Sequence, residues 1–341
     1  MSSNKNEKPE VLSQVRELSV TYHTRLGPVS AVDRVSFDIY KGEILGLVGE
    51  SGCGKSTLGK GLMRMIASPG EVSHGQHIFD GEDIMEYNER QMRDFRGRRV
   101  SMIFQDPMTS LNPVQRVDEH IIEAIKVHEP GTKKEGALAR AKILIERLGI
   151  QERRLTDYPH QLSGGMRQRV MVGLGLVLNA DLIIADEATT SLDVIVEAKL
   201  VDQLKEIRDE FGVSILMITH NIALVAQVAD RLAVMYAGRM VELGDVNEVF
   251  ENPKHPYTQG LLSCIPTIKI DKNEELYKMP GEPPNLTHPP KGCRFHPRCP
   301  HAMPICSQKR PTLKEEGDGH FVHCWLYQDH ELEDEQLNNE V

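Results

Sequence analysis

The stretch GESGCGKST, from Gly49 to Thr57, decides the fold of this 341-residue chain. It fits the phosphate-loop pattern G-x-x-x-x-G-K-[ST] and follows the apolar run ILGLVG at 44–49, which is typical of a buried strand. In such a loop, glycines let backbone N–H groups surround a phosphate chain, and the next helix adds the positive end of its dipole. A chance glycine-rich turn is the alternative. Such a turn would not require a strand before it and a helix after it, so the presence of both patterns favours nucleotide binding. The residues expected to bind nucleotide are Gly49, Ser51, Gly52, Cys53, Gly54, Lys55, Ser56 and Thr57.

Three side chains of this loop carry specific chemistry. The Lys55 ammonium can reach the β- and γ-phosphates of a nucleotide, and the Ser56 hydroxyl can ligate Mg²⁺. Cys53 lies among the loop glycines, where N–H groups and Lys55 could lower the pKa of its thiol and make it reactive. An inert thiol is the alternative, and we favour it.

Other short apolar runs alternate with longer helical patterns along the chain. VSMIF (100–104), LIIAD (182–186) and VSILMIT (213–219) are apolar on both faces, as strands covered by helices are. The alternation predicts an α/β fold with a largely parallel sheet. The stretch 116–160 has helical periodicity and many charges, so it is expected to form an inserted helical lobe.

Two carboxylates follow the run LIIAD. Asp186 at the end of this strand could hold Mg²⁺ through water. Glu187 beside it could polarise the attacking water as a general base. A plain acidic turn is the alternative, and the phosphate loop makes the catalytic interpretation the better one.

The motif LSGGM at 162–166 precedes a second helix with an apolar stripe. Ser163, Gly164 and Gly165 could form a simple helix cap. They could also present free N–H groups to a phosphate. Because the chain has one phosphate loop, this second surface could serve the nucleotide of another chain.

Six motifs occur in the order seen in ATP-binding-cassette ATPases, and the chain resembles that family from about residue 11 to 250. The motifs are the phosphate loop, Gln105 after VSMIF, LSGGM, LIIADE, SLD (Ser191–Asp193) and His220 after LMIT. The resemblance implies a RecA-like phosphate-loop core with a β-subdomain and a helical subdomain at about 106–165. It also implies that two cassettes enclose two ATP molecules, each lying between one chain's phosphate loop and the other chain's Ser163–Gly165.

The resemblance assigns roles to four further residues. Gln105 is expected to contact Mg²⁺ and the attacking water, so the implied Mg²⁺ ligands are Ser56, Gln105 and Asp186. His220 is expected to contact the γ-phosphate and joins Glu187 and Gln105 as a catalytic residue. Asp193 is expected to link the two sites across the dimer, and Tyr22 to stack on adenine.

Two stretches beyond the shared cassette motifs resemble the ATPases of oligopeptide and dipeptide permeases, a subfamily that includes nickel importers. They are FQDPMTSLNP (104–113) and NPKHPYTQGLL (252–262), and the tail GEPPNL…GCRFHPRCPHAMPIC fits as well. This resemblance implies an ATP-hydrolysing motor of an importer on the cytoplasmic side of the cell membrane. Its implied partners are a second ATPase subunit, as a heterodimer, two membrane permease subunits and an external solute-binding protein. The solute stays open between di- or oligopeptides, a nickel complex and an oligosaccharide.

Composition agrees with a soluble motor and opposes two other classes. A net charge of −10 argues against nucleic acid as a partner, because phosphate binding needs a basic face. The polar start MSSNKNEKPE is not a signal peptide, and the longest apolar runs fall short of a membrane span. A cassette ATPase acting on DNA or ribosomes is the first alternative, disfavoured by the single cassette and the missing heptads. A regulatory protein that uses ATP only as a signal would not need Glu187 and His220.

Four of the six cysteines lie in the last fifty residues, within a region expected to be an extension at 251–341. Twelve of the nineteen prolines fall between Pro253 and Pro311, so this region is expected to be rich in loops and to lack its own core. Disulfides are disfavoured in a reducing compartment. The resemblance implies a [4Fe–4S] cluster as the cross-link, with structural Zn²⁺ as the alternative. Its expected ligands are Cys293, Cys299, Cys306 and Cys324.

Overall fold

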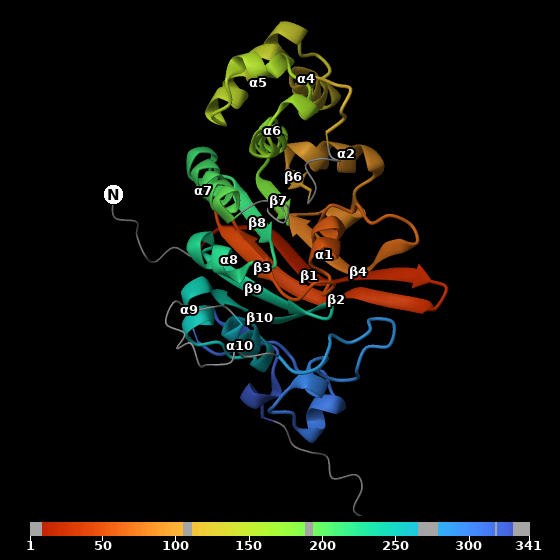
Figure 1. Cartoon of the computed structure of the whole chain (residues 1–341). Coiled ribbons are helices and arrows are strands. Elements are labelled where there is room, and N and C mark those ends of the chain that lie inside the picture. The colour runs from red at the N-terminus through yellow and green to blue at the C-terminus, as the bar shows by residue number, and fades with distance from the viewer. Residues whose placement is uncertain (1–8, 105–110, 188–193, 265–278, 318, 330–341) are drawn as a thin grey trace, which may run out of the picture.

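The computed structural model describes residues 9–104, 111–187, 194–264, 279–317 and 319–329 (Figure 1). The larger of two sheets in this part has eight strands in the order β11-β12-β10-β9-β3-β8-β7-β6. Its strands are β3 (Ile44–Val48), β6 (Val100–Ile103), β7 (Leu182–Asp186), β8 (Ser214–Ile218), β9 (Arg231–Tyr236), β10 (Arg239–Asp245), β11 (Lys314–Glu315) and β12 (Phe321–Val322).

The central strands of this sheet are parallel, as the sequence predicts. β3 pairs in parallel with β8 and with β9, and β7 pairs in parallel with β6 and β8. Every residue of β3, β7 and β8 is buried, which explains why these strands are apolar apart from Ser214 and Asp186 at two of their ends. Because the carboxyl ends of parallel strands meet at one edge, the segments that follow β3, β7 and β8 gather there.

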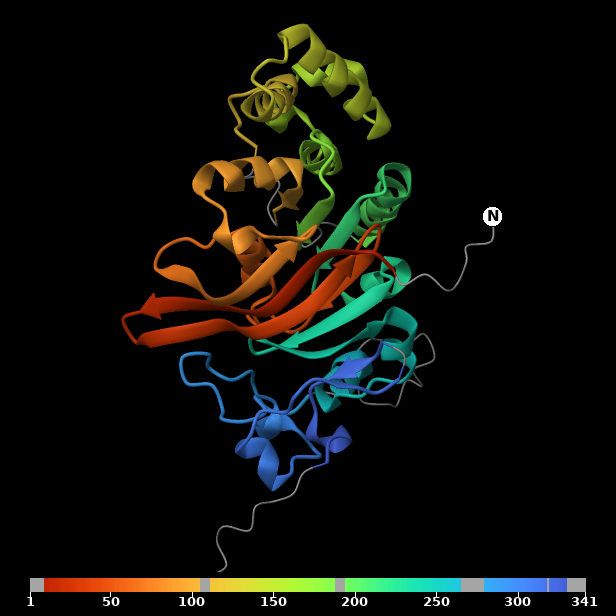
Figure 2. The same cartoon turned by 180° about the vertical axis from the view of Figure 1, so that it is seen from behind.

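A second, antiparallel sheet packs against one face of the first. Leu45 and Leu47 of β3 belong to the apolar cluster shared by the two sheets, whereas Ile44 and Val48 point to the helices on the other face. Figure 2 shows the two long strands of this sheet crossing the molecule in front of the central strands. Its strands, in the order β2-β1-β4-β5, are β1 (Val11–Thr24), β2 (Gly27–Tyr40), β4 (Gly70–Phe79) and β5 (Glu82–Asp83).

The helices surround this core, and three of them form a lobe at one end (Figure 1). α4 and α5 pack on α6 through apolar side chains such as Ile125, Ala141 and Leu144. The helices are α1 (Lys55–Leu62), α2 (Glu89–Arg98), α4 (Val117–His128), α5 (Lys134–Arg147), α6 (Gly164–Leu176), α7 (Val194–Phe211), α8 (Ile222–Val228), α9 (Val246–Glu251) and α10 (Pro256–Ser263). Short 3₁₀ helices are η1 (Ile84–Glu86), η2 (Glu152–Thr156), η3 (Pro159–Gln161), η4 (His296–Arg298), η5 (Pro304–Ser307) and η6 (Trp325–Tyr327).

The C-terminal segment, described over residues 279–317 and 319–329, lies against β10 and β2, at the opposite end from the helical lobe (Figures 1 and 2). β12 adds to β10 as an antiparallel neighbour, and β11 adds to β12. In the middle of this contact, Glu242 of β10 is fully buried and accepts a 2.7 Å hydrogen bond from His320 Nε2. The proline-rich segment therefore joins the central sheet instead of forming a separate layer.

A charged contact ties the same segment to β2. The Asp33 carboxylate accepts hydrogen bonds at 2.8 Å from Arg239 Nε and from Arg294 Nη2, and Arg310 Nη1 lies 3.7 Å away. Burial tends to raise the pKa of Asp33, but the arginines outweigh it, so the pKa of this carboxyl is lowered. Two of these arginines come from the C-terminal segment, so a single carboxylate fixes it to the smaller sheet.

Candidate functional site

The phosphate-loop sequence forms a loop between β3 and α1 that only glycines can build. Gly49 has φ +153°, and a Cβ there would lie 2.1 Å from the Met235 carbonyl oxygen. Gly54, the N-cap of α1, has φ +103°, and a Cβ there would lie 2.2 Å from the Ala31 carbonyl oxygen. Side chains at these positions would collide with backbone, so the two glycines let the loop fold tightly against neighbouring strands.

Lys55, the first residue of α1, folds back over the loop. Its side chain is buried, and Nζ donates hydrogen bonds to the carbonyls of Gly49 at 2.8 Å and Glu50 at 3.1 Å. The loop carbonyls thus hold an ammonium where the expected phosphate chain would need a cation.

Ser56 and Asp186 meet across the sheet edge. The Ser56 hydroxyl donates a 2.7 Å hydrogen bond to Asp186 Oδ1 at the end of β7. Burial raises the pKa of Asp186, and the hydrogen bond from Ser56 opposes this shift. A hydroxyl and a carboxylate are hard oxygen donors that suit Mg²⁺, so the two residues that sequence reasoning named as Mg²⁺ ligands lie together. The third, Gln105, falls outside the described residues, as does Asp193.

Glu187 and His220 follow the neighbouring parallel strands β7 and β8. His220 Nδ1 lies 3.9 Å from Glu187 Oε1. Glu187 takes up a left-handed backbone conformation with φ 45°, and its N–H donates to the Ile218 carbonyl at 2.8 Å. A non-glycine residue in this conformation carries backbone strain, which is common at functional sites. Glu187 directly follows the Asp186 that contacts Ser56, so Glu187 and His220, two of the three expected catalytic residues, lie together at the edge of the sheet where the phosphate loop begins.

The expected second phosphate surface lies at the start of α6. Ser163 is the N-cap, and its hydroxyl accepts a 3.4 Å hydrogen bond from the Met166 N–H. Ser163 and Gly164 are exposed, and Gly165 is half-buried. The cap interpretation and the phosphate interpretation are both compatible with this geometry, and an exposed helix start is accessible to a second chain.

Tyr22 lies in β1 with its ring against β4. A Cβ at Gly70 would lie 2.5 Å from this ring, so the glycine makes room for it. Its expected contact with adenine stays a prediction.

Cys53 does not have the lowered pKa that a reactive thiol would need. Burial raises its pKa, although Lys55 Nζ lies 3.8 Å from the sulfur and acts in the opposite direction. The thiol is 4% exposed. The structure supports the inert alternative, because protonated and buried thiols are poor nucleophiles.

The prediction of an iron–sulfur cluster, with zinc as the alternative, is wrong. Within the described residues, which include Cys293, Cys299, Cys306 and Cys324, no three His, Cys, Asp or Glu side chains form a group that could hold a metal ion. All four are free cysteines. Burial raises the pKa of Cys293 to about 11 and that of Cys324 to about 12, which keeps the thiols protonated.

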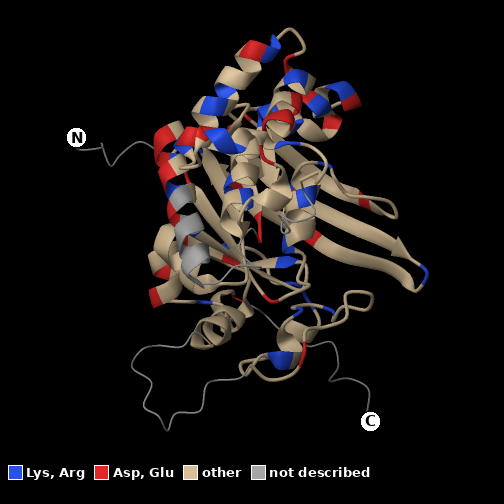
Figure 3. Ribbon diagram, turned by 45° about the horizontal axis from the view of Figure 1, so that its top comes forward, with Lys and Arg blue, Asp and Glu red and all other residues tan. Residues whose placement is uncertain are grey.

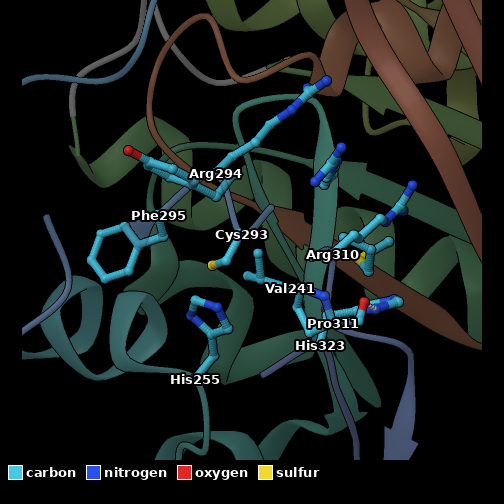
Figure 4. Close-up of a pocket in the computed structure, with 11 residues that line it drawn as sticks. Val241, His255, Cys293, Arg294, Phe295, Arg310, Pro311 and His323 are labelled. Atoms are coloured by element: carbon cyan, nitrogen blue, oxygen red, sulfur yellow. Dashed lines mark hydrogen bonds between the residues drawn. The ribbon is translucent and has the colours of Figure 1, made fainter. Parts of the chain in front are cut away.

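The surroundings of the cysteines explain this result. Figure 4 shows the Cys293 sulfur between the rings of Phe295 and His255. Cys293 and Cys299 also pack against the main apolar cluster, as small hydrophobic side chains do. The β12–β10 pairing and the arginines on Asp33 join this segment to the two sheets.

Sequence reasoning missed the residues that hold the loop from behind. The Glu50 N–H donates to the Tyr257 hydroxyl at 2.8 Å, and the Glu50 carboxylate pairs with Arg298. The Cys53 carbonyl accepts from the Gly238 N–H at 2.8 Å. Glu50 occupies an unspecified position of the loop pattern and its partners are distant in sequence, so no motif could have identified them.

Comparisons with known proteins identify the family of this chain. A family model described as ABC transporter matches residues 32–190, and a second, described as oligopeptide/dipeptide transporter, C-terminal region, matches residues 241–306. The oligopeptide transport ATP-binding protein OppD of Bacillus subtilis (strain 168) is 45% identical over 92% of this chain and 88% of that protein. OppD of Escherichia coli (strain K12) is 43% identical over 94% of each. The dipeptide transport ATP-binding protein DppD of Bacillus subtilis (strain 168) is 43% identical over 97% of this chain and 99% of that protein.

Solved structures show the same fold. A dimeric bacterial ABC transporter cassette has a TM-score of 0.62 at 24% identity and covers 69% of this chain and 99% of that chain. The structure of cbiO1 from Clostridium perfringens, part of an ABC transporter complex, has a TM-score of 0.61 at 27% identity. It covers 71% of this chain and 92% of that chain. No helix in the described residues is long and apolar enough to span a bilayer. The predicted fold class and subfamily are confirmed: the chain belongs to the ATP-binding-cassette ATPases, among the ATP-binding proteins of oligopeptide and dipeptide transporters.

Proposed function

We propose that this chain is the ATP-hydrolysing subunit of a membrane importer that carries di- or oligopeptides into the cell. The observation that carries the proposal is the convergence of Lys55, Ser56, Asp186, Glu187 and His220 at one edge of the parallel sheet. Ser56 contacts Asp186 at 2.7 Å, and His220 lies 3.9 Å from Glu187. The match of the C-terminal region to the oligopeptide/dipeptide transporter model supports peptide as the solute.

The phosphate-binding half of the site acts before the chemical step. Backbone N–H groups of the loop and the start of α1 bind the phosphate oxygens, and Lys55 leaves the loop carbonyls to meet the β- and γ-phosphates. Mg²⁺, when bound, neutralises charge on these phosphates. Ser56, Asp186 and Gln105 are the residues that would hold this cation.

The hydrolytic half activates water. Glu187 accepts a proton from a water molecule as that water's oxygen bonds to the γ-phosphorus. The bond from phosphorus to the bridging oxygen breaks, and ADP leaves with the electron pair. His220 contacts the γ-phosphate. It also lies beside Glu187 and orients the Glu187 side chain. Tyr22 stacks on adenine, and the Ser163–Gly165 turn and Asp193 complete the site of a second cassette.

Similarity to ATP-binding proteins of oligopeptide and dipeptide transporters supports a place for this chain in a permease complex. The chain acts at the cytoplasmic side of the membrane, beside a second ATPase subunit and two permease subunits, with an external solute-binding protein delivering the peptide. Basic and acidic residues are interspersed along the helices of the helical lobe (Figure 3). This mixture of charges supports a protein partner there rather than nucleic acid.

The test uses the native complex reconstituted in vesicles, with uptake of labelled di- and tripeptides measured against ATP hydrolysis. We expect ATP-dependent peptide uptake that is lost in Lys55→Ala, because productive nucleotide binding is lost. If a nickel complex or an oligosaccharide stimulates hydrolysis and peptides do not, the assigned solute changes but the motor role stands. A wild-type complex that neither binds nor hydrolyses ATP would overturn the proposal itself.

A further inference from the structure

Arg298 of the C-terminal segment reaches the phosphate loop. Its Nη1 donates to Glu50 Oε2 at 2.8 Å and its Nη2 donates to Glu50 Oε1 at 3.0 Å. Two parallel hydrogen bonds between a guanidinium and a carboxylate form the strongest and most directional ion pair available to proteins. Glu50 directly follows Gly49, so the pair contacts the loop itself.

The pair is built into the protein rather than formed at the surface. The Arg298 side chain is 5% exposed and that of Glu50 is 24% exposed. Arg298 Nε also donates to the Pro280 carbonyl at 2.8 Å, and Nη1 lies 3.2 Å from the Tyr236 hydroxyl. Burial works against the charge of Arg298, but the hydrogen bonds to Glu50 and Tyr236 prevail and raise its pKa. The guanidinium therefore stays charged and fixed in place.

Aromatic packing fixes the same corner of the loop. Tyr257 of α10 accepts a 2.8 Å hydrogen bond from the Glu50 N–H. Its ring lies 4.6 Å from that of Tyr236 and 5.4 Å from that of Phe295, between ring centroids. Both the backbone and the side chain of Glu50 are thus held by residues that lie after β9.

Charge gives this contact a consequence for nucleotide binding. The loop binds a polyanion, and an unpaired Glu50 carboxylate next to it would repel the phosphates. Arg298 neutralises that carboxylate and holds it away from solvent. Loss of Arg298 alone leaves a half-buried negative charge beside the phosphate chain, whereas loss of both charges leaves none.

We propose that Arg298 is a positioning residue for ATP: it makes the C-terminal segment part of the nucleotide site, so that docking of this segment and binding of ATP favour each other. Thermodynamic linkage requires the effect to be reciprocal. The inference rests on ATP binding at the phosphate loop, as proposed above, and assigns to the segment a role that needs no metal.

The experiment measures nucleotide affinity and ATPase kinetics of the full chain. We expect Arg298→Met to weaken ATP binding by roughly 5- to 150-fold, the usual span of coupling between two sites. ADP should be affected less and AMP least, because the repulsion scales with phosphate charge. KM should rise while kcat stays near the wild-type value, because the interaction acts on bound ATP and on the transition state alike. Arg298→Lys keeps the positive charge but cannot make two parallel hydrogen bonds to Glu50. Its ATP affinity should therefore lie between those of the wild type and Arg298→Met.

A second variant separates charge from folding. Glu50→Gln combined with Arg298→Met should recover most of the ATP affinity, because neither buried charge is left alone. Arg310→Met is the matched control: Arg310 also joins the C-terminal segment to the cassette, through Asp33 and the Arg34 carbonyl, but does not contact the loop. It should bind ATP like the wild type, because the segment stays docked through Arg294 and the β12–β10 pairing and the Arg298–Glu50 contact is intact.

The reciprocal arm measures hydrogen–deuterium exchange in residues 292–317. ATP should slow exchange there in the wild type and not in Arg298→Met. Equal weakening by Arg298→Met and Arg310→Met, or equal weakening for ATP, ADP and AMP, would overturn the inference in favour of general loss of structure. If Arg298→Met does not fold, Glu50→Gln alone is the test. The charge argument expects its ATP affinity to equal or exceed that of the wild type. A lower ATP affinity would contradict the argument. Failure of the wild type to bind ATP would refute the proposed function, not this coupling.

Discussion

The Ser56 hydroxyl lies 2.7 Å from Asp186 Oδ1, joining the start of α1 to the end of β7 across 130 positions of the sequence. Between β3 and β7 in the sheet lies β8, so the contact spans the strand whose end carries His220. This arrangement places two of the proposed Mg²⁺ ligands beside Glu187, the proposed general base.

Asp186→Asn should change the dependence of ATPase activity on Mg²⁺ more than the affinity for ATP itself. The amide keeps the size of the side chain and can still contact Ser56, but it removes the negative charge that holds the cation. We expect the Mg²⁺ concentration for half-maximal activity to rise roughly 10- to 100-fold, as for loss of an outer-shell metal partner. Titration of Mg²⁺ at saturating ATP measures this shift. An unchanged midpoint would remove Asp186 from the Mg²⁺ site.

Glu187→Gln should separate binding from hydrolysis. Without the carboxylate that accepts a proton, hydrolysis should fall by about 10²- to 10⁴-fold. ATP binding should persist, and closed dimers should accumulate, as size-exclusion chromatography with MgATP can show. The comparison is Lys55→Ala, which should lose binding as well. Because two cassettes can have unequal sites, the measurement is made with the partner site inactivated. Normal turnover by Glu187→Gln under that condition would assign the general base elsewhere.

Two buried histidines should make folding stability sensitive to acid. Burial lowers the pKa of both His77 and His255 to about 4, from an ordinary value of 6.5. Between pH 6.5 and 4, these histidines bind protons in the unfolded chain but stay neutral in the folded chain. Their contribution to the free energy of unfolding is therefore complete above pH 6.5 and falls as the pH drops toward 4. Each histidine should add a slope of about 1.4 kcal/mol per pH unit.

Urea unfolding at several pH values tests this expectation. His77 is held by Ser13 Oγ at 2.7 Å and the Leu62 carbonyl at 3.0 Å, both of which a glutamine could satisfy. His77→Gln should therefore reduce the slope between pH 6.5 and 4 by one histidine's share, whatever its effect on stability at neutral pH. A slope equal to that of the wild type would show that His77 is not kept neutral by burial.

Thiol labelling should rank Cys264 ahead of Cys53. Cys264 is exposed at the end of α10, whereas the Cys53 thiol is buried and its pKa is raised. Brief treatment with iodoacetamide at neutral pH should modify the Cys264 peptide first, as mass spectrometry of the digest will show. Cys264→Ser should remove that early product. Faster labelling of Cys53 would contradict the inert assignment and revive a reactive thiol in the loop.

The grouping of the candidate site residues at one edge of the sheet could be predicted because these residues lie in short motifs beside strands. The loop glycines and Lys55 are fixed by one local pattern, and Asp186, Glu187 and His220 directly follow buried apolar runs. In a parallel sheet, the carboxyl ends of the strands meet at one edge whatever the intervening sequence does. Alternation of apolar runs and helical patterns was therefore enough to gather these side chains.

The role of the cysteines could not be predicted in this way. The spacing of Cys293, Cys299, Cys306 and Cys324 says that four thiols lie near one another in sequence, but a metal site depends on the direction of each sulfur and on its protonation. The folded segment buries Cys306 and Cys324 and partly buries Cys293 and Cys299, and this burial raises the pKa of Cys293 and Cys324. Desolvation is a property of the packed structure, so sequence spacing alone gave the wrong cofactor.

By itself, then, the sequence determined the phosphate loop, the parallel sheet and the residues at its edge, because each depends on neighbours close along the chain. Only the tertiary structure decided how the C-terminal segment is held and what it contacts. The pairing of Arg298 with Glu50 joins positions 248 residues apart, and neither residue belongs to a motif that predicts the other. Such a contact arises from the geometry of packing, in which β12 joins β10 and aromatic rings fix the arginine, and local sequence carries no record of that geometry.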